Sequence, residues 1–135
     1  MRQPTVREFM DSEVPTLTAD VDIHEAVNFL LDSRVTGAPV LNELGQVVGI
    51  VTEKDMLRLL TKGGQDGNPV RGTVAEYMTK NPVTVTPDMN IYYAAGLFLH
   101  HAFRRLPVVS GDLRLVGAIT RFDILRAIRA NAATL

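Results

Sequence analysis

Apolar residues recur with a helical period in two segments of the chain. Between residues 23 and 31 they occupy the first, fourth, fifth, eighth and ninth positions, and the same spacing returns between residues 91 and 99. This spacing gathers them on one face of a helix, so both segments predict amphipathic helices packed on one side. Asp22 and Asn90 stand directly before the two segments, where a side-chain oxygen can cap the first backbone amides. Glu25 adds a box-like arrangement in the first segment only.

Shorter apolar runs surround each of these helices. Two runs after the helix predict buried strands, one extended piece precedes it, and a second helix follows the last strand. The predicted order is therefore β-α-β-β-α, written twice, each time after a short helical lead. In the first and second copy, respectively, the lead is "TVREFM" and "TVAEYM", and the extended piece is "PTLT" and "VTVT". The first strand is "APVL" and "LPVV", and the second strand is "QVVGIVT" and "RLVGAIT". The last helix is "EKDMLRLL" and "RFDILRAIRA".

The two copies are an internal repeat without a gap. "GIVTEKD", residues 49–55, returns 68 positions later (117 − 49) as "GAITRFD", residues 117–123. One register over so many positions defines a tandem pair, so we assign residues 5–60 to the first copy and 73–130 to the second. Residues 61–72 form a linker whose Gly, Asn and Pro content predicts a flexible surface connection. Identical pairs at this offset include Val6 and Val74, Met10 and Met78, Thr16 and Thr84, Asp20 and Asp88, Pro39 and Pro107, and Arg58 and Arg126.

Size and composition favour one shared core. The chain has 135 residues, 46% of them hydrophobic. One copy of about 60 residues buries little apolar surface, and its stability alone would be marginal. We therefore expect an α/β (α+β) protein in which the two copies pack sheet against sheet with pseudo-twofold symmetry.

Several classes of site and compartment are disfavoured by composition. The chain has no cysteine, which excludes disulfides and thiolate metal sites and fits a reducing compartment. No apolar stretch reaches the roughly 18 residues that span a bilayer, and the first ten residues lack a signal-peptide core. His24 is isolated and His100 and His101 point in different directions on a helix, so we expect no metal and no cofactor. We expect a soluble, cytoplasmic protein with no membrane contact.

The charges divide unevenly between the halves. Residues 1–67 carry 6 Lys and Arg against 11 Asp and Glu, a net of −5, and residues 68–135 carry 8 against 4, a net of +4. The asymmetry indicates either an anionic partner of the second half or two faces that attract one another. The total of −1 argues against a nucleic-acid partner.

The repeated Gly-apolar-apolar-Thr-x-x-Asp motif has two interpretations. The glycine, inside a strand, admits close approach of another group. Thr and Asp lie on one side of the first turn of the following helix, where an ionised carboxylate can accept two hydrogen bonds from the vicinal hydroxyls of a ribose. The same residues also form a capping box that satisfies free backbone amides. The motif alone leaves both open.

The order of elements, the apolar-Pro-Val strand and the Gly-apolar-apolar-Thr-x-x-Asp ending together resemble the cystathionine beta-synthase (CBS) domain. The tandem pair is similar to a Bateman module, and the resemblance runs from about Thr5 to Ala130. It implies a regulatory module, not an enzyme, with clefts between the paired copies that bind AMP, ADP, ATP or S-adenosylmethionine. It also implies a homodimer that forms through the helices and signals to an effector protein.

The resemblance places candidate ligand-binding residues in both copies. Arg104 and Arg105 stand where family members often carry a basic pair for phosphate, although the same arginines also suit a solvated helix end. The first copy has Thr36 and Gly37 there, and Glu53 where the second copy has Arg121, so we expect the second copy to bind nucleotide better. The predicted second-copy site is Thr84, Arg104, Arg105, Leu106, Thr120, Arg121 and Asp123, and its weaker counterpart is Thr16, Ala38, Thr52 and Asp55.

Two functions remain as hypotheses. In the first, adenine nucleotides occupy one or both clefts and shift the chain between conformations that an effector recognises, which requires different affinities for the two conformations. In the second, the pair is a ligand-free scaffold for dimerisation and interaction. For the dimer we expect a head-to-tail arrangement that sets the acidic half of one chain beside the basic half of the other.

Overall fold

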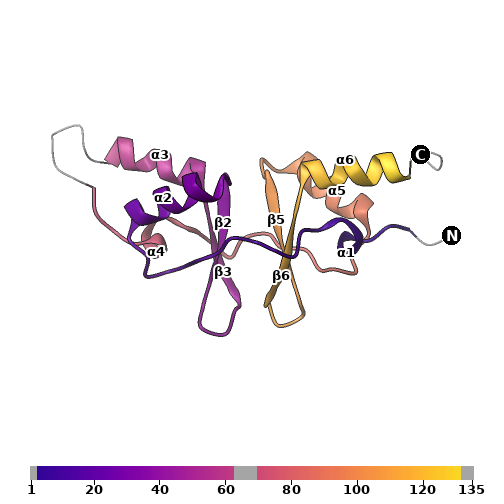
Figure 1. Ribbon diagram of the computed structural model, residues 1–135, viewed down its shortest axis with the longest axis horizontal. Coiled ribbons are helices and arrows are strands. Elements are labelled where there is room, and N and C mark those ends of the chain that lie inside the picture. Colours follow the sequence, from indigo (N-terminus) through magenta and orange to yellow (C-terminus); the bar gives the residue numbers. More distant parts are fainter. Residues whose placement is uncertain (1–2, 63–69, 132–135) are drawn as a thin grey trace. The chain divides into compact units, whose positions relative to one another are not determined.

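A computed structural model describes residues 3–62 and 70–131 (Figure 1). The chain divides into two compact units: unit 1 is Met1–Val14 with Val83–Leu135, and unit 2 is Pro15–Pro82. The predicted mixed α/β class with two repeats of strands and helices is confirmed. Residues 63–69 of the predicted linker lie outside the described residues. The elements in chain order are α1 Val6–Phe9, β1 Leu17–Thr18, α2 Ile23–Ser33, β2 Gly37–Leu41, β3 Val47–Thr52, α3 Glu53–Lys62, α4 Val74–Tyr77, β4 Thr79–Lys80, α5 Ile91–His100, β5 Arg105–Val109, β6 Leu115–Thr120 and α6 Arg121–Ala130.

Unit 2 contains a four-stranded sheet in the order β1-β2-β3-β4. Strand β1 pairs parallel with β2, and β2 and β3 form an antiparallel hairpin with Ala38 opposite Val51. Strand β4 pairs antiparallel with β3, with Gly49 opposite Lys80. The edge strand β4 precedes the helix of the second copy in sequence, so the second copy contributes an edge to the sheet of the first.

Unit 1 contains the antiparallel β5–β6 hairpin, in which Leu106 lies opposite Ile119. Single bridges extend it on both sides: Val85 pairs parallel with Val108, and Asp11 pairs antiparallel with Ala118. The extended piece predicted at residues 83–86 is therefore one bridge and not a strand. It ends early because the chain turns directly afterwards, where the amide of Met89 donates to the carbonyl of Thr86 at 3.2 Å.

The two helical leads are exchanged between the copies; from here on the exchanged leads are residues 5–14 and 73–82, which extend each lead to the boundary of its unit. In unit 1, the amide of Val6 in α1 donates to the carbonyl of Met89 at 2.9 Å. In unit 2, the amide of Val74 in α4 donates to the carbonyl of Val21 at the same distance. The first amides of a short helix have no partner inside the helix, and here the other copy supplies their acceptors. Each lead therefore completes the unit of the copy to which it does not belong in sequence.

The motif glycines make room for these exchanged leads. A Cβ atom built on Gly117 would lie 2.7 Å from the carbonyl oxygen of Asp11, and one built on Gly49 would lie 3.0 Å from that of Thr79. Both oxygens belong to backbone and cannot swing away like the end of a side chain. The close approach expected from glycine inside a strand is thus made by the lead of the other copy.

Each unit has its own hydrophobic core between its helices and one face of its sheet. In Figure 1, α2 and α3 lie on one side of β2 and β3, and α5 and α6 lie on one side of β5 and β6. The core of unit 2 includes Leu17, Ile23, Ala26, Leu30, Ala38, Val40, Val51, Val74 and Tyr77. The core of unit 1 includes Val6, Val85, Ile91, Ala94, Phe98, Leu106, Val108, Ile119 and Ala127. Within the described ranges, no helix has the length and apolar character needed to cross a bilayer.

Candidate functional site

Both Thr-x-x-Asp motifs form a reciprocal capping box at the junction of a strand and a helix. At the start of α6, the carboxylate of Asp123 accepts from the Thr120 amide at 2.9 Å and from its hydroxyl at 3.0 Å. The amide of Asp123 donates back to the Thr120 hydroxyl at 3.2 Å. Thr52 and Asp55 repeat the box at the start of α3, with distances of 2.9, 3.1 and 3.4 Å. Both carboxyl residues are only 9% exposed. The interpretation of the motif as a capping box is therefore confirmed, and the ligand-binding interpretation stays open.

A third member of the motif is the arginine one turn further along each helix. Arg126 donates to the Asp123 carboxylate at 3.1 Å and to the carbonyl of Phe9 at 3.4 Å, and its guanidinium lies 6.0 Å from the centroid of the Phe9 ring. In unit 2, Arg58 contacts the Asp55 carboxylate at 3.2 Å and also donates to the carbonyl of Tyr77. Phe9 and Tyr77 end the helices α1 and α4 of the exchanged leads, so each Thr-x-x-Asp-x-x-Arg group ties a helix to the lead beside it.

The two carboxylates differ in how many hydrogen bonds they have left to accept. A carboxylate offers about four acceptor positions. Asp55 receives four hydrogen bonds, from the Thr52 amide and hydroxyl, from Arg58, and from the Thr79 hydroxyl at 3.5 Å. Asp123 receives three, because no counterpart of the Thr79 bond forms among the described residues of unit 1. Asp123 thus has one acceptor position more than Asp55 left for a further donor.

A cavity of about 180 Å³ lies beside Asp123. It opens on the face of the β5–β6 hairpin that is turned away from the hydrophobic core. Arg105 and Thr120 are paired across the hairpin and both face this cavity, whereas their neighbours Leu106 and Ile119 face the core. The full lining is Asp11, Glu13, Val14, Arg105, Ala118, Thr120 and Asp123.

The cavity unites only part of the predicted second-copy site. Arg105, Thr120 and Asp123 line it, whereas Thr84, Arg104 and Arg121 do not. Leu106 is 1% exposed and belongs to the core of unit 1, and its counterpart Ala38 is fully buried in the core of unit 2, so neither side chain is exposed. Thr16 is half-buried directly before β1.

Sequence analysis missed Asp11 and Glu13, because it assigned them to the first copy. They stand in the first copy's lead, which the exchange carries to the second copy's hairpin. The signal available in the sequence was the glycine of the motif, which predicts a close neighbour without saying which segment provides it.

The exchange also reduces the contrast in charge between the two parts of the chain. Unit 1 has 8 Lys and Arg against 6 Asp and Glu, a net of +2, and unit 2 has 6 against 9, a net of −3.

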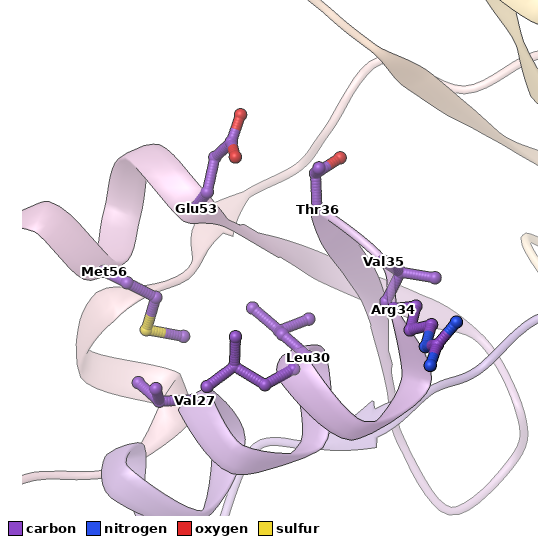
Figure 2. Close-up of a pocket in the computed structure, with 8 residues that line it drawn as sticks. Val27, Leu30, Arg34, Val35, Thr36, Glu53 and Met56 are labelled. Atoms are coloured by element: carbon purple, nitrogen blue, oxygen red, sulfur yellow. The ribbon is translucent and has the colours of Figure 1, made fainter.

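A second cavity, of about 370 Å³, lies in unit 2 on the helical side of the sheet. Figure 2 shows Val27, Leu30 and Met56 converging on it, while the guanidinium of Arg34 points away. Thr36 and Glu53, which replace the arginines of the second copy, stand at its edge. Its lining is mainly apolar, and it contains neither Thr52 nor Asp55.

No three His, Asp or Glu side chains of the described residues are placed to hold a metal ion.

Comparison with known proteins assigns the chain to a family. The CBS domain model matches residues 6–62 and 74–130. The chain therefore belongs to the CBS domain family, and it is a tandem CBS pair.

Relatives and solved structures agree with this assignment. The chain is 37% identical over 128 residues to the uncharacterized protein MJ1225 of Methanocaldococcus jannaschii, a match that covers 95% of the chain and 44% of that relative. Its fold is similar to that of Arabidopsis thaliana CBSX2 in complex with AMP, with a TM-score of 0.83, 32% identity, and coverage of 96% of the chain and 98% of CBSX2. It is also similar to the CBS pair of MJ0100 in complex with 5′-methylthioadenosine and S-adenosylmethionine, with a TM-score of 0.77, 26% identity, and coverage of 96% and 99%.

Proposed function

We propose that this CBS pair is a regulatory module that binds an adenosine-containing ligand, and that the cavity beside Asp123 in unit 1 is its principal site. The observation that carries the proposal is this cavity: it combines a capping-box threonine, a carboxylate with one free acceptor position, and an arginine. The ligands of CBSX2 and MJ0100, which are AMP, 5′-methylthioadenosine and S-adenosylmethionine, support the class of ligand.

The arrangement can read a nucleoside through one ribose hydroxyl. That hydroxyl donates to the free position on Asp123, and Thr120 lies beside it in the lining. The Arg105 side chain has no hydrogen bond or ion pair with any other described residue, so its guanidinium can donate to an anionic or carbonyl group of the ligand without breaking an existing contact. In unit 2 the corresponding carboxylate is already saturated, which makes Thr52 and Asp55 the weaker pair. Because Asp11 and Glu13 belong to the exchanged lead, a ligand here contacts both copies and can report its presence to an effector protein.

Calorimetric titration tests the ligand. We expect AMP or S-adenosylmethionine to give heat with the wild-type chain and none with Ala118→Leu, which fills the cavity without removing a polar group. Asp123→Ala should also abolish the heat. The matched control, Asp55→Ala, changes the corresponding group of unit 2 and should keep the signal of unit 1.

If the wild type gives no heat with AMP, ATP and S-adenosylmethionine at millimolar concentration, the proposed function is contradicted. A signal that survives Ala118→Leu but disappears in Asp55→Ala would move the principal site to unit 2. Circular dichroism of every variant separates lost binding from lost folding.

A second candidate function is a homodimerisation scaffold, and exposed apolar side chains on the helices favour it. Leu60 of α3 is 72% exposed, and Leu99 of α5 is 84% exposed. Phe122 and Leu125 of α6 are 70% and 61% exposed. Exposed apolar side chains of this kind, on the helices of each unit, mark surfaces that a partner covers. We propose that a second copy of the chain covers these side chains, head to tail, so that the unit with net charge −3 of one chain lies beside the unit with net charge +2 of the other.

Light scattering tests the dimer. The wild type should have twice the mass of one chain, and Leu125→Glu should convert it to monomer, because the substitution places a charge in an apolar interface. Leu44→Glu is the matched control: Leu44 is 63% exposed but lies in the turn between β2 and β3, so this variant should stay dimeric. A monomeric wild type, or a Leu125→Glu dimer as stable as the wild type, would contradict the interface.

A further inference from the structure

The cavity beside Asp123 is acidic because of the exchanged lead. Asp11 and Glu13, both of which carry a carboxylate, are among its lining residues, and both are exposed. The Asp123 carboxylate is paired with Arg126 at 3.1 Å, which leaves Arg105 as the cation to oppose Asp11 and Glu13. These five side chains sum to three negative and two positive charges, a net of −1. A cavity of this charge is a poor site for a chain of phosphates.

The corresponding positions of the other unit are neutral. Asp11 and Glu13 correspond, at the offset of 68 residues, to Thr79 and Asn81. Thr79 donates its hydroxyl to Asp55 at 3.5 Å. Asp11 is a carboxylate when ionised and can only accept, so it gives no such bond to Asp123. The difference at this one position leaves Asp123 with a free acceptor and adds a second acceptor to the same cavity.

Acceptors that converge on a cavity select ligands with donor groups. Hydroxyl, amino and ammonium groups satisfy Asp11, Glu13 and Asp123, whereas phosphate oxygens are repelled by them. At about 4 Å, even fully hydrated like charges repel enough to change a binding constant roughly five-fold for each pair. The positive charge of Arg105 offsets the charge of one carboxylate, so the cavity should accept a ligand with one phosphate more readily than a ligand with three.

We propose that Asp11 and Glu13 are specificity-determining residues, which make the unit 1 cavity select adenosine ligands with a neutral or cationic 5′ group over adenosine polyphosphates. The expected order of affinity is 5′-methylthioadenosine and S-adenosylmethionine first, then AMP, then ATP. This inference rests on the proposed function, because it concerns the ligand of the same cavity. It reverses the expectation from sequence that the arginines of the second copy favour phosphate: two of them, Arg104 and Arg121, lie outside the cavity lining, and the acidic lead lies within it.

Titration of these four ligands into the full chain, in EDTA and at low and high salt, tests the inference. The wild type should bind 5′-methylthioadenosine at least ten-fold more tightly than ATP. Added salt should raise the affinity for ATP, because it screens the repulsion between the phosphates and the carboxylates. It should lower the affinity for S-adenosylmethionine, because it screens the attraction between the cation and the carboxylates. The double variant Asp11→Asn/Glu13→Gln should reduce the ratio of the two affinities by about ten-fold, mainly by tightening ATP.

The variants are chosen to keep the fold. Asparagine at position 11 retains a side-chain oxygen for the Glu13 amide, which Asp11 accepts at 2.9 Å. Glu43→Gln, in the turn between β2 and β3, removes one negative charge far along the chain from the lead and should leave all four affinities unchanged. Equal wild-type affinity for ATP and 5′-methylthioadenosine, or an unchanged ratio in the double variant, would overturn this inference and leave the proposed function standing. Absence of binding for all four ligands would overturn both.

Discussion

Substitution of Gly117 by alanine should lower the free energy of unfolding by about 2 to 3 kcal/mol, the upper part of the range of roughly 1 to 3 kcal/mol that added volume costs in a packed site. The new Cβ would lie 2.7 Å from the backbone oxygen of Asp11 and 2.9 Å from the sulfur of Met10. The Met10 side chain can turn away, but the backbone of the lead cannot move without breaking its two 2.9 Å hydrogen bonds with Ala118. Urea unfolding measures the loss. Hydrogen exchange should show the amides of Asp11 and Ala118 losing protection first.

Gly96→Ala is the matched control for this substitution. Gly96 lies inside helix α5, and a Cβ atom built on it meets nothing within 4 Å. Alanine is the better helix former by about 1 kcal/mol, so this variant should be more stable than the wild type. A Gly117→Ala protein as stable as the wild type, with the Asp11 amide still protected, would contradict the close packing of the lead on β6.

The secondary structure could be predicted from the sequence because its signals are local. The helical spacing of apolar residues from Ile23 gave the buried face of α2, and Asp22 caps that helix as expected, accepting from the amides of His24 and Glu25. The strands β2 and β3 were bounded by their apolar runs. Two predictions of local structure failed: strand β4 at Thr79–Lys80 was missed, and the extended piece at residues 83–86 forms one bridge. The second failure has a local cause, because the turn at Thr86 leaves only Val85 in extended pairing.

The candidate site could be predicted only in part, because it is completed by a segment distant in sequence. Thr120 and Asp123 are three residues apart and follow from the motif. Arg105 lies opposite Thr120 in the hairpin, a pairing that follows from the two predicted strands. Asp11 and Glu13 are more than a hundred residues from Asp123 in sequence. Because the two copies are equivalent, each lead could pack on either of two similar hairpins. Local sequence patterns do not show which hairpin it packs on.

Truncation of Asp123 to alanine should cost about 3 kcal/mol of stability. The change removes the side-chain half of the capping box, worth about 1 kcal/mol in most helices. It also leaves the Thr120 amide and Arg126 without the acceptor that they share at 2.9 and 3.1 Å, which adds the penalty of unsatisfied groups. Asp55→Ala removes the corresponding contacts from unit 2, and the Thr79 hydrogen bond in addition, so its effect should be at least as large. Urea unfolding of both variants measures it.

A double-mutant cycle with Arg126→Met separates the structural and ligand-binding roles of Asp123. If the carboxylate holds Arg126, and through it the carbonyl of Phe9, then the two substitutions together should cost less than the sum of each alone, by about 1 kcal/mol or more. The Arg126→Met chain retains the capping box and all the residues that line the cavity, so it should still bind ligand. Additive effects, or an Asp123→Ala protein within 0.5 kcal/mol (roughly the effect of a neutral surface substitution) of the wild type, would mean that Asp123 is kept for the ligand and not for the fold.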